Sequence, residues 1–243
     1  MIVRELILAV QFLTRLPTPQ VRDFRAEDLT RSARWFPLVG LLIGAALLLP
    51  LWALEARPWL AAVLALLAWV WITGALHLDG LGDVADALGA AHRSPERFLE
   101  VLKDPHLGVF GVVAIVMQLL LKVVLLAELA GSPWLCGIVL VPAWCRWATL
   151  LWSRTLPPLQ AGMAERFAWQ LGIWPLLLWA PLLGALSLWL APPLLLALLL
   201  APLGIAYWRR RLGGISGDCL GASTEVMETL LLLALVAGTL LLR

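Results

Sequence analysis

The feature that most constrains this chain is a stretch of 36 residues, 173–208, without a charged side chain. One helix of that length would be about 54 Å long, whereas the membrane interior needs only about 20 residues. Pro192 and Pro193 interrupt the stretch, so it predicts two membrane-spanning helices. Over the whole chain 62% of residues are hydrophobic and 14% are charged, against about 25% charged in soluble domains. This composition excludes a soluble enzyme, a disordered protein and a fibrous protein.

Other apolar segments of nearly the same character bring the predicted number of spans to seven. We expect an all-α, polytopic integral membrane bundle that forms a single catalytic domain over residues 1–243. Residues 1–34 form a cytoplasmic or interfacial N-terminal segment, and residues 1–15 are an amphipathic candidate for the membrane surface. The last span is short unless its helix begins in the preceding polar segment. The five further spans are residues 36–54, 59–76, 107–127, 134–152 and 229–242.

The distribution of positive charge predicts the orientation. Arg57 and Arg243 lie on the side opposite the N-terminus, and Lys122 and Arg146 lie within spans. Cytoplasmic loops are enriched in Lys and Arg, so the N-terminus and every long polar segment are expected to face the cytoplasm. The net charge of +2 gives no indication of a nucleic-acid partner. The fourteen basic residues on the N-terminal side are Arg4, Arg15, Arg22, Arg25, Arg31, Arg34, Arg93, Arg97, Lys103, Arg154, Arg166, Arg209, Arg210 and Arg211.

The first polar motif is the segment HLDGLGDVAD, residues 77–86. On a helix its three acidic residues, Asp79, Asp83 and Asp86, share one face. Three neighbouring carboxylates without a local positive charge suggest a divalent cation, and all-oxygen ligands favour Mg²⁺. The alternative is a solvated acidic helix end, although solvated faces normally mix both signs of charge.

The second and third motifs flank later spans. Lys103 and Asp104 precede the third span and are candidates for a phosphate contact and a further metal ligand, respectively, although they could equally form a surface ion pair. In the third motif, RRRLGGISGDCLGASTE (209–225), glycine-rich backbone is suited to binding phosphate. Asp218 and Glu225 add oxygen ligands, and the three arginines mainly anchor the topology. The candidate phosphate-binding glycines are Gly213, Gly214, Gly217 and Gly221.

An ionisable side chain within a span usually faces the interior of the bundle. Arg146 is therefore either half of a structural ion pair or a contact for a substrate anion. Together these residues predict a metal-dependent phosphoryl or nucleotidyl transfer site that faces the cytoplasm. An Asp-Gly sequence in a membrane helix is also found in CDP-alcohol phosphotransferases, but the Ala-Arg pair and second Asp pair of that pattern are missing. A transporter is the other alternative, although the polar residues cluster at one face and not at the midplane.

The first and third motifs resemble the hallmark segments of the cobalamin synthase family, the adenosylcobinamide-GDP ribazoletransferases. The segments FLTRLP (12–17) and FPLVG (36–40), Gly44, and Lys103-Asp104 with Gly108 and Gly111 are similar as well. The resemblance runs from about residue 10 to residue 228. Family members commonly have Arg where this chain has His106, and Gly where it has Ala87.

The resemblance implies an Mg²⁺-dependent enzyme of a bacterial or archaeal cell (inner) membrane. Such an enzyme joins adenosylcobinamide-GDP to α-ribazole, or to its 5′-phosphate, and releases GMP. A ribose hydroxyl would attack the pyrophosphate, and Asp86, Asp218 or His77 would accept its proton. Five acidic groups cannot all ligate one ion, so we expect either two ions or a division of roles. The implied partners are these two small molecules and the lipid bilayer, and a homo-oligomer is left open.

Overall fold

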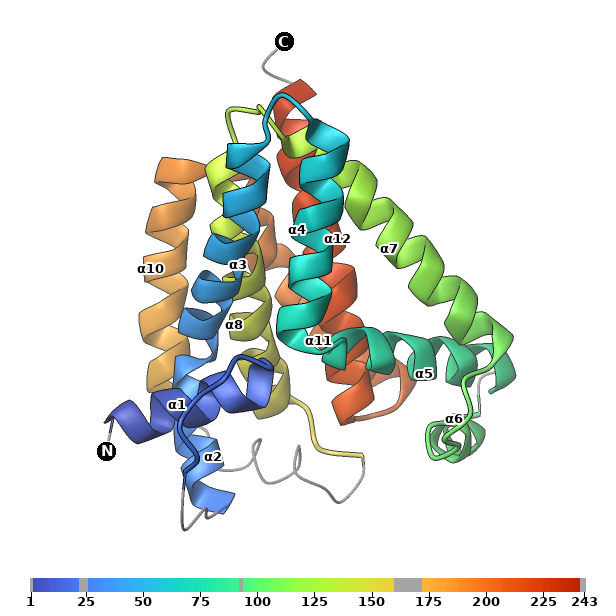
Figure 1. Cartoon of the computed structure of the whole chain (residues 1–243). Coiled ribbons are helices and arrows are strands. Elements are labelled where there is room, and N and C mark those ends of the chain that lie inside the picture. Colours follow the sequence, from blue (N-terminus) through green and yellow to red (C-terminus); the bar gives the residue numbers. More distant parts are fainter. Residues whose placement is uncertain (1, 22–25, 92–93, 160–171, 241–243) are drawn as a thin grey trace.

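The computed structural model describes residues 2–21, 26–91, 94–159 and 172–240. Within these ranges the regular structure is helical apart from one isolated bridge between Pro158 and Ile215, which confirms the all-α prediction (Figure 1). The 3-10 helices are η1 (Ala33–Trp35), η2 (Leu135–Val139) and η3 (Pro192–Leu196). The α-helices are α1 (Ile2–Leu13), α2 (Ala26–Ser32), α3 (Phe36–Ala53), α4 (Pro58–Thr73), α5 (Leu76–Ala90), α6 (Pro95–Val101), α7 (Val109–Leu129), α8 (Leu140–Thr155), α10 (Trp174–Leu190), α11 (Ala197–Arg211) and α12 (Gly217–Leu240).

Among the described residues, five helical segments are long and apolar enough to cross a membrane, and a sixth is reached if the bent pair α4 and α5 is counted as one span. The remaining apolar helix, α10, has only 17 residues. The polytopic helical bundle is therefore confirmed, and the count of seven spans stays a prediction. The five segments are Glu27–Ala53, Val109–Leu129, Leu135–Thr155, Pro192–Arg211 and Gly217–Thr239.

The structure confirms two predictions about the spans, namely where the long uncharged stretch breaks and where the last predicted span begins. The long uncharged stretch breaks at Ala191, between α10 and η3. The last span begins inside the third motif, because α12 starts at Gly217 and is 24 residues long. This corrects one expectation: residues 217–225 are the first turns of a helix and not a glycine-rich loop.

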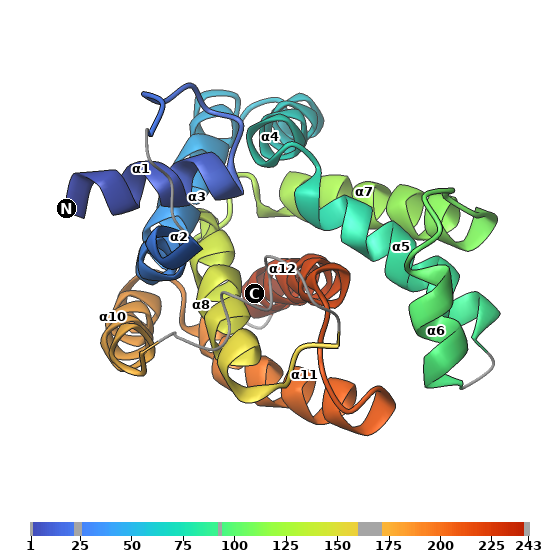
Figure 2. The same ribbon diagram turned by 90° about the horizontal axis from the view of Figure 1, so that it is seen from below.

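The first motif lies on α5, a helix at one end of the bundle. α4 ends at Thr73, and Gly74 and Ala75 both adopt left-handed backbone conformations, with φ of 62° and 59°. The chain turns by 87° between α4 and α5, so α5 extends sideways from the end of α4 (Figures 1 and 2). α5 therefore presents its faces at one end of the bundle and does not cross it.

Close backbone packing of α3 on α8 forms the centre of the fold. A Cβ atom at Gly40 would lie 2.5 Å from Ala143 Cα, and one at Gly44 would lie 2.4 Å from Val139 O. Only glycine allows such an approach, and small residues at helix contacts are typical of membrane bundles. α8 is consequently the most enclosed of the candidate spans, with 78% of its segment buried.

The N-terminal helix α1 lies across the end of the bundle where α2 and α6 are also found (Figures 1 and 2). Glu5 on its inner face is buried and pairs with Arg34, while Ile2 and Val3 are exposed. α1 and the end of α12 lie at opposite ends of the bundle (Figure 1), as an odd number of spans requires. Five arginines of the charge count lie outside the described residues: Arg22, Arg25, Arg93, Arg166 and Arg243.

Candidate active site

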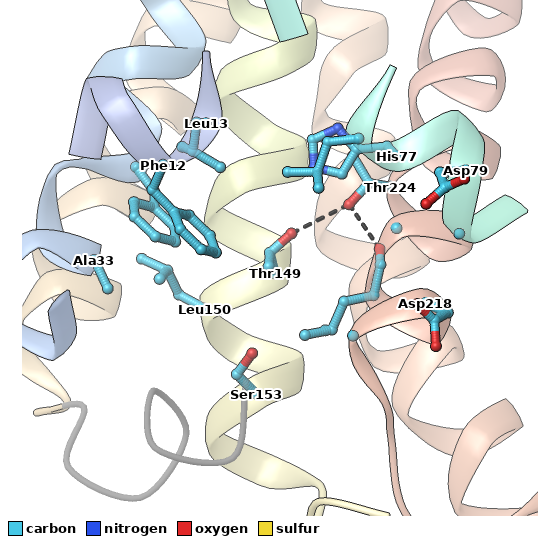
Figure 3. A pocket seen from close by; sticks show the side chains of 16 residues that line it. Phe12, Leu13, Ala33, His77, Asp79, Thr149, Leu150, Ser153, Asp218 and Thr224 are labelled. Carbon is cyan, nitrogen blue, oxygen red and sulfur yellow. Dashed lines mark hydrogen bonds between the residues drawn. The ribbon is translucent and has the colours of Figure 1, made fainter. Parts of the chain in front are cut away.

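A cavity of about 220 Å³ opens between α1, α3, α5, α8 and α12, at the end of the bundle that carries α1 (Figure 3). One wall is apolar and includes Phe12, Phe36 and Leu150. The opposite wall is polar and comes from α5, α8 and α12. Its side chains are His77, Asp79, Thr149, Ser153, Asp218 and Thr224.

The first and third motifs meet at this polar wall. A Cβ atom at Gly80 would lie 2.8 Å from Asp218 O and 3.0 Å from Asp218 Cα. A Cβ atom at Gly221 would lie 3.3 Å from His77 O. Because both glycines lack a side chain, α5 rests directly on the first turns of α12. This contact brings Asp79 and Asp218, which are 139 positions apart in the sequence, to the same cavity.

The carboxylates on α5 repel one another. Partial burial and the nearby charges of Asp79, Asp218 and Asp86 raise the pKa of Asp83 to about 6. Within the described ranges, no ion pair neutralises Asp79, Asp83 or Asp218. Uncompensated carboxylates of this kind favour the binding of a cation.

Asp86 has a structural partner that the sequence did not reveal. Its two oxygens accept hydrogen bonds from the backbone N–H groups of Gly108, at 2.7 Å, and Gly111, at 2.9 Å. These amides belong to the N-terminus of α7, so Asp86 caps that helix from α5. A Cβ atom at Gly111 would lie 2.4 Å from Asp86 Oδ2. Asp86 therefore holds α7 against α5, and it does not line the cavity.

The second motif lies away from the cavity. Lys103 and Asp104 are in the connection between α6 and α7, and neither lines the cavity. Asp104 Oδ1 lies 2.7 Å from His106 Nδ1, and this hydrogen bond lowers the pKa of Asp104. A role for Lys103 and Asp104 in binding phosphate or metal stays a prediction.

Glu225, a candidate metal ligand, is held in a buried charge network instead. Lys122 Nζ lies 2.6 Å from Glu225 and 2.7 Å from Glu228, and Arg146 pairs with Glu228. Lys122 also lies 4.2 Å from the centroid of the Trp69 ring. The network contains two cations and two carboxylates, so its charge is balanced. Of the two interpretations of Arg146, the structure shows the ion pair.

His77 connects this network to the cavity. Its Nδ1 lies 3.4 Å from a guanidinium nitrogen of Arg146. Burial, reinforced by the positive charge of Arg146, lowers the pKa of His77 to about 3. A neutral imidazole of such low pKa is a weak base, so the structure favours a carboxylate in that role.

The four candidate glycines divide into two pairs. Gly213 forms the turn after α11 with a φ of 75°, and a Cβ atom at Gly214 would lie 2.3 Å from Pro157 O. These two join the α11–α12 turn to the end of α8. Gly217 and Gly221 line the cavity on the first turns of α12. The backbone N–H groups of a helix N-terminus attract phosphate. The N-terminus of α12, and not a loop, is therefore the candidate phosphate-binding element.

The part of the chain that the structure describes holds no ready-made metal cage. Among the described residues, no group of three or more His, Cys, Asp or Glu side chains is arranged to hold a metal ion. Mg²⁺, however, commonly uses one or two carboxylates together with substrate phosphates and water. The two cavity carboxylates, Asp79 and Asp218, fit that kind of site, with Asp83 adjacent.

Three hydroxyl residues of the cavity, Thr149 and Ser153 on α8 and Thr224 on α12, were not identified from the sequence. Thr149 and Thr224 share a hydrogen bond of 3.2 Å, and Thr224 donates to Leu220 O at 2.8 Å (Figure 3). The sequence does contain a signal for two of them, because Thr149 and Ser153 are four positions apart and therefore share one face of α8. Thr224 follows Gly217 and Gly221 on the same face of α12.

Comparison with known proteins identifies the family. A profile described as cobalamin-5-phosphate synthase matches residues 5–236. The chain belongs to the cobalamin-5-phosphate synthase family. The resemblance seen in the motifs is therefore confirmed, and the match includes all residues of the cavity.

Similar members of the cobalamin-5-phosphate synthase family match over nearly their whole length. An adenosylcobinamide-GDP ribazoletransferase of Laribacter hongkongensis is 58% identical over 98% of this chain and 98% of its own. Proteins of the same name from Thiobacillus denitrificans and Novosphingobium aromaticivorans are 49% and 50% identical, over 95% of this chain and 94–95% of theirs. No solved structure matches this chain.

Proposed function

We propose that this transferase of cobalamin biosynthesis is an adenosylcobinamide-GDP ribazoletransferase. It would join adenosylcobinamide-GDP to α-ribazole, or to its 5′-phosphate, and release GMP. The observation that carries the proposal is the contact of α5 with the N-terminus of α12, which brings Asp79 and Asp218 to one cavity. The names and full-length similarity of the relatives supply the substrates.

We infer that Mg²⁺ takes part, held by Asp79 and Asp218 with Asp83 in support. When bound between protein and pyrophosphate, the ion would neutralise charge on the phosphate oxygens. Partial burial, together with repulsion from the neighbouring carboxylates, raises the pKa of Asp83, and the uncompensated negative charge supports a cation here. The protein's own backbone and side chains would orient the substrates and accept the proton.

The polar wall would orient the pyrophosphate and accept a proton. The N-terminal amides of α12 at Gly217 would face the departing GMP phosphate. Asp218, which is partly buried in the cavity, would take the proton from the attacking ribose hydroxyl as that oxygen bonds to phosphorus. Phe12 and Phe36, whose rings stack at 5.7 Å, provide a flat apolar wall for the heteroaromatic ring of the ribazole.

The direct test is GMP release by the purified protein given adenosylcobinamide-GDP, α-ribazole and Mg²⁺. We expect Asp79→Asn and Asp218→Asn each to lower kcat by at least 100-fold. Glu100→Gln is the matched control, because Glu100 is an exposed carboxylate at the same end of the bundle. Wild-type turnover in either aspartate variant, or full activity in EDTA, would overturn the corresponding assignment.

We further propose that the cavity faces the bacterial cytoplasm. The described segments rich in Lys and Arg lie at the end of the bundle with α1, and the α3–α4 turn with Arg57 lies at the other end (Figure 1). Cysteine labelling tests this orientation in a Cys136→Ser background, since Cys136 is the exposed native cysteine. Lys103→Cys should react only from inside and Ala56→Cys only from outside. Reaction of Lys103→Cys from outside would contradict the proposed orientation.

The alternative of a transporter is not favoured by the charges at mid-bundle. Lys122, Arg146, Glu225 and Glu228 are at most 5% exposed and are paired with one another. A carrier needs polar groups that a substrate can reach near the midplane. The polar groups lining the cavity lie instead at one end of the bundle.

A further inference from the structure

Helix α5 has a second face that the proposed reaction does not use. Leu81, Val84, Ala85 and Leu88 follow one another at helical spacing. They lie on the side of α5 opposite to Asp79, Asp83 and Asp86. This apolar face forms one wall of a groove of about 430 Å³ between α5, α11 and α12.

The groove is suited to an apolar occupant. Its polar ring nitrogens already have partners, because Trp208 Nε1 donates to Ser223 at 2.6 Å and Trp152 Nε1 donates to Ala201 O at 2.8 Å. The opening is marked by Leu203 and Val226, which are 54% and 48% exposed. Both belong to helices that are candidate spans. The groove therefore opens towards lipid chains and not towards bulk water.

The groove ends beside a group of positive charges. Tyr207 and Trp208 line its end, with ring centroids 4.8 Å apart, and both residue types favour the membrane interface. Arg210 and Arg211 follow on the same face of α11, three or four positions later. Within the part of the chain that the structure describes, neither arginine makes an ion pair.

We propose that this groove binds one anionic phospholipid. An acyl chain lies between α5 and α11, and the headgroup phosphate lies against Arg210 and Arg211. Basic pockets between spans are known to recognise acidic headgroups. A zwitterionic lipid would fill the groove equally well but would not satisfy both arginines. The bound chain would support α5 on the side opposite its carboxylates.

The test counts lipids on the purified full-length protein by native mass spectrometry after incubation with phosphatidylglycerol or phosphatidylcholine. We expect one tightly held lipid with a clear preference for phosphatidylglycerol. In Arg210→Gln/Arg211→Gln this preference should fall by about 25-fold, at about fivefold per arginine. Arg57→Gln removes an exposed arginine at the opposite end of the bundle and should leave the preference unchanged.

A second variant tests the apolar part of the site. Val226→Trp places a large ring in the groove and should displace the lipid whatever its headgroup. The proposal fails if the wild type holds both lipids equally, or if Arg57→Gln loses as much preference as the double variant. It also fails if Val226→Trp retains the lipid, or if the protein is a dimer that this substitution dissociates. If Val226→Trp does not fold, the arginine variants still decide the outcome.

Discussion

Replacing Asp83 by asparagine should make the protein more stable while lowering its activity. Asp83 ionises at a pKa of about 3.8 when unfolded and about 6 when folded, because partial burial and neighbouring carboxylates disfavour its charge. A shift of that size corresponds to about 3 kcal/mol. Since the side chain is only partly buried, solvent screening reduces the effect to about 1–1.5 kcal/mol.

The direction of the effect depends on pH. A carboxyl whose pKa is raised on folding lowers the free energy of unfolding as pH rises from about 4 to 6, and the loss is complete above pH 6. The asparagine side chain cannot ionise, so Asp83→Asn should gain about 1–1.5 kcal/mol at pH 7.5 and almost nothing at pH 4. The assay is equilibrium unfolding in detergent with EDTA, followed by tryptophan fluorescence.

Asp86→Ala is the matched comparison, because this neighbouring carboxylate caps α7. Loss of a helix cap costs about 0.5–2 kcal/mol, so the two substitutions should change stability in opposite directions. Added Mg²⁺ should then stabilise the wild type more than Asp83→Asn. The reasoning is refuted if Asp83→Asn does not raise the free energy of unfolding at pH 7.5, or if it raises that free energy by the same amount at pH 4.

Other substitutions test the packing around the site. Glu228→Gln leaves buried cations without full compensation and should destabilise the protein by about 3 kcal/mol or more in the same unfolding assay; wild-type stability would contradict the buried network. Gly80→Ala places a Cβ atom against the Asp218 backbone, so GMP release should fall at least tenfold, and an unchanged kcat would argue against direct contact of α5 with α12. Gly44→Ala meets the α8 backbone and should destabilise the bundle, whereas Gly184→Ala, with open space around it, should be neutral or stabilise by about 1 kcal/mol; equal effects would refute the close packing of α3 on α8.

The features that could be predicted from the sequence are those set by local chemistry. Apolar length indicated the spans, and the paired prolines indicated the break near Ala191. Helical spacing placed Asp79, Asp83 and Asp86 on one face of α5. None of these features depends on which helices pack together.

The features that could not be predicted depend on tertiary contacts. Asp86 was expected in the reaction, but its partners lie 22 and 25 positions away at the start of α7. Glu225 was expected at the metal, but it pairs with Lys122, which lies 103 positions away. The motif alone does not show which acidic side chains are buried, because the same helical spacing can place a carboxylate against a cavity or against a neighbouring span.

The buried charge network also has a consequence for biosynthesis. Lys122 and Arg146 belong to α7 and α8, whereas Glu225 and Glu228 both belong to α12, which is synthesised after both of those helices. Until α12 inserts, the growing chain holds two uncompensated cations at membrane depth, where unpaired charge is costly. A chain that stops before α12 therefore keeps both cations unpaired, and insertion of α12 supplies the two carboxylates that neutralise them.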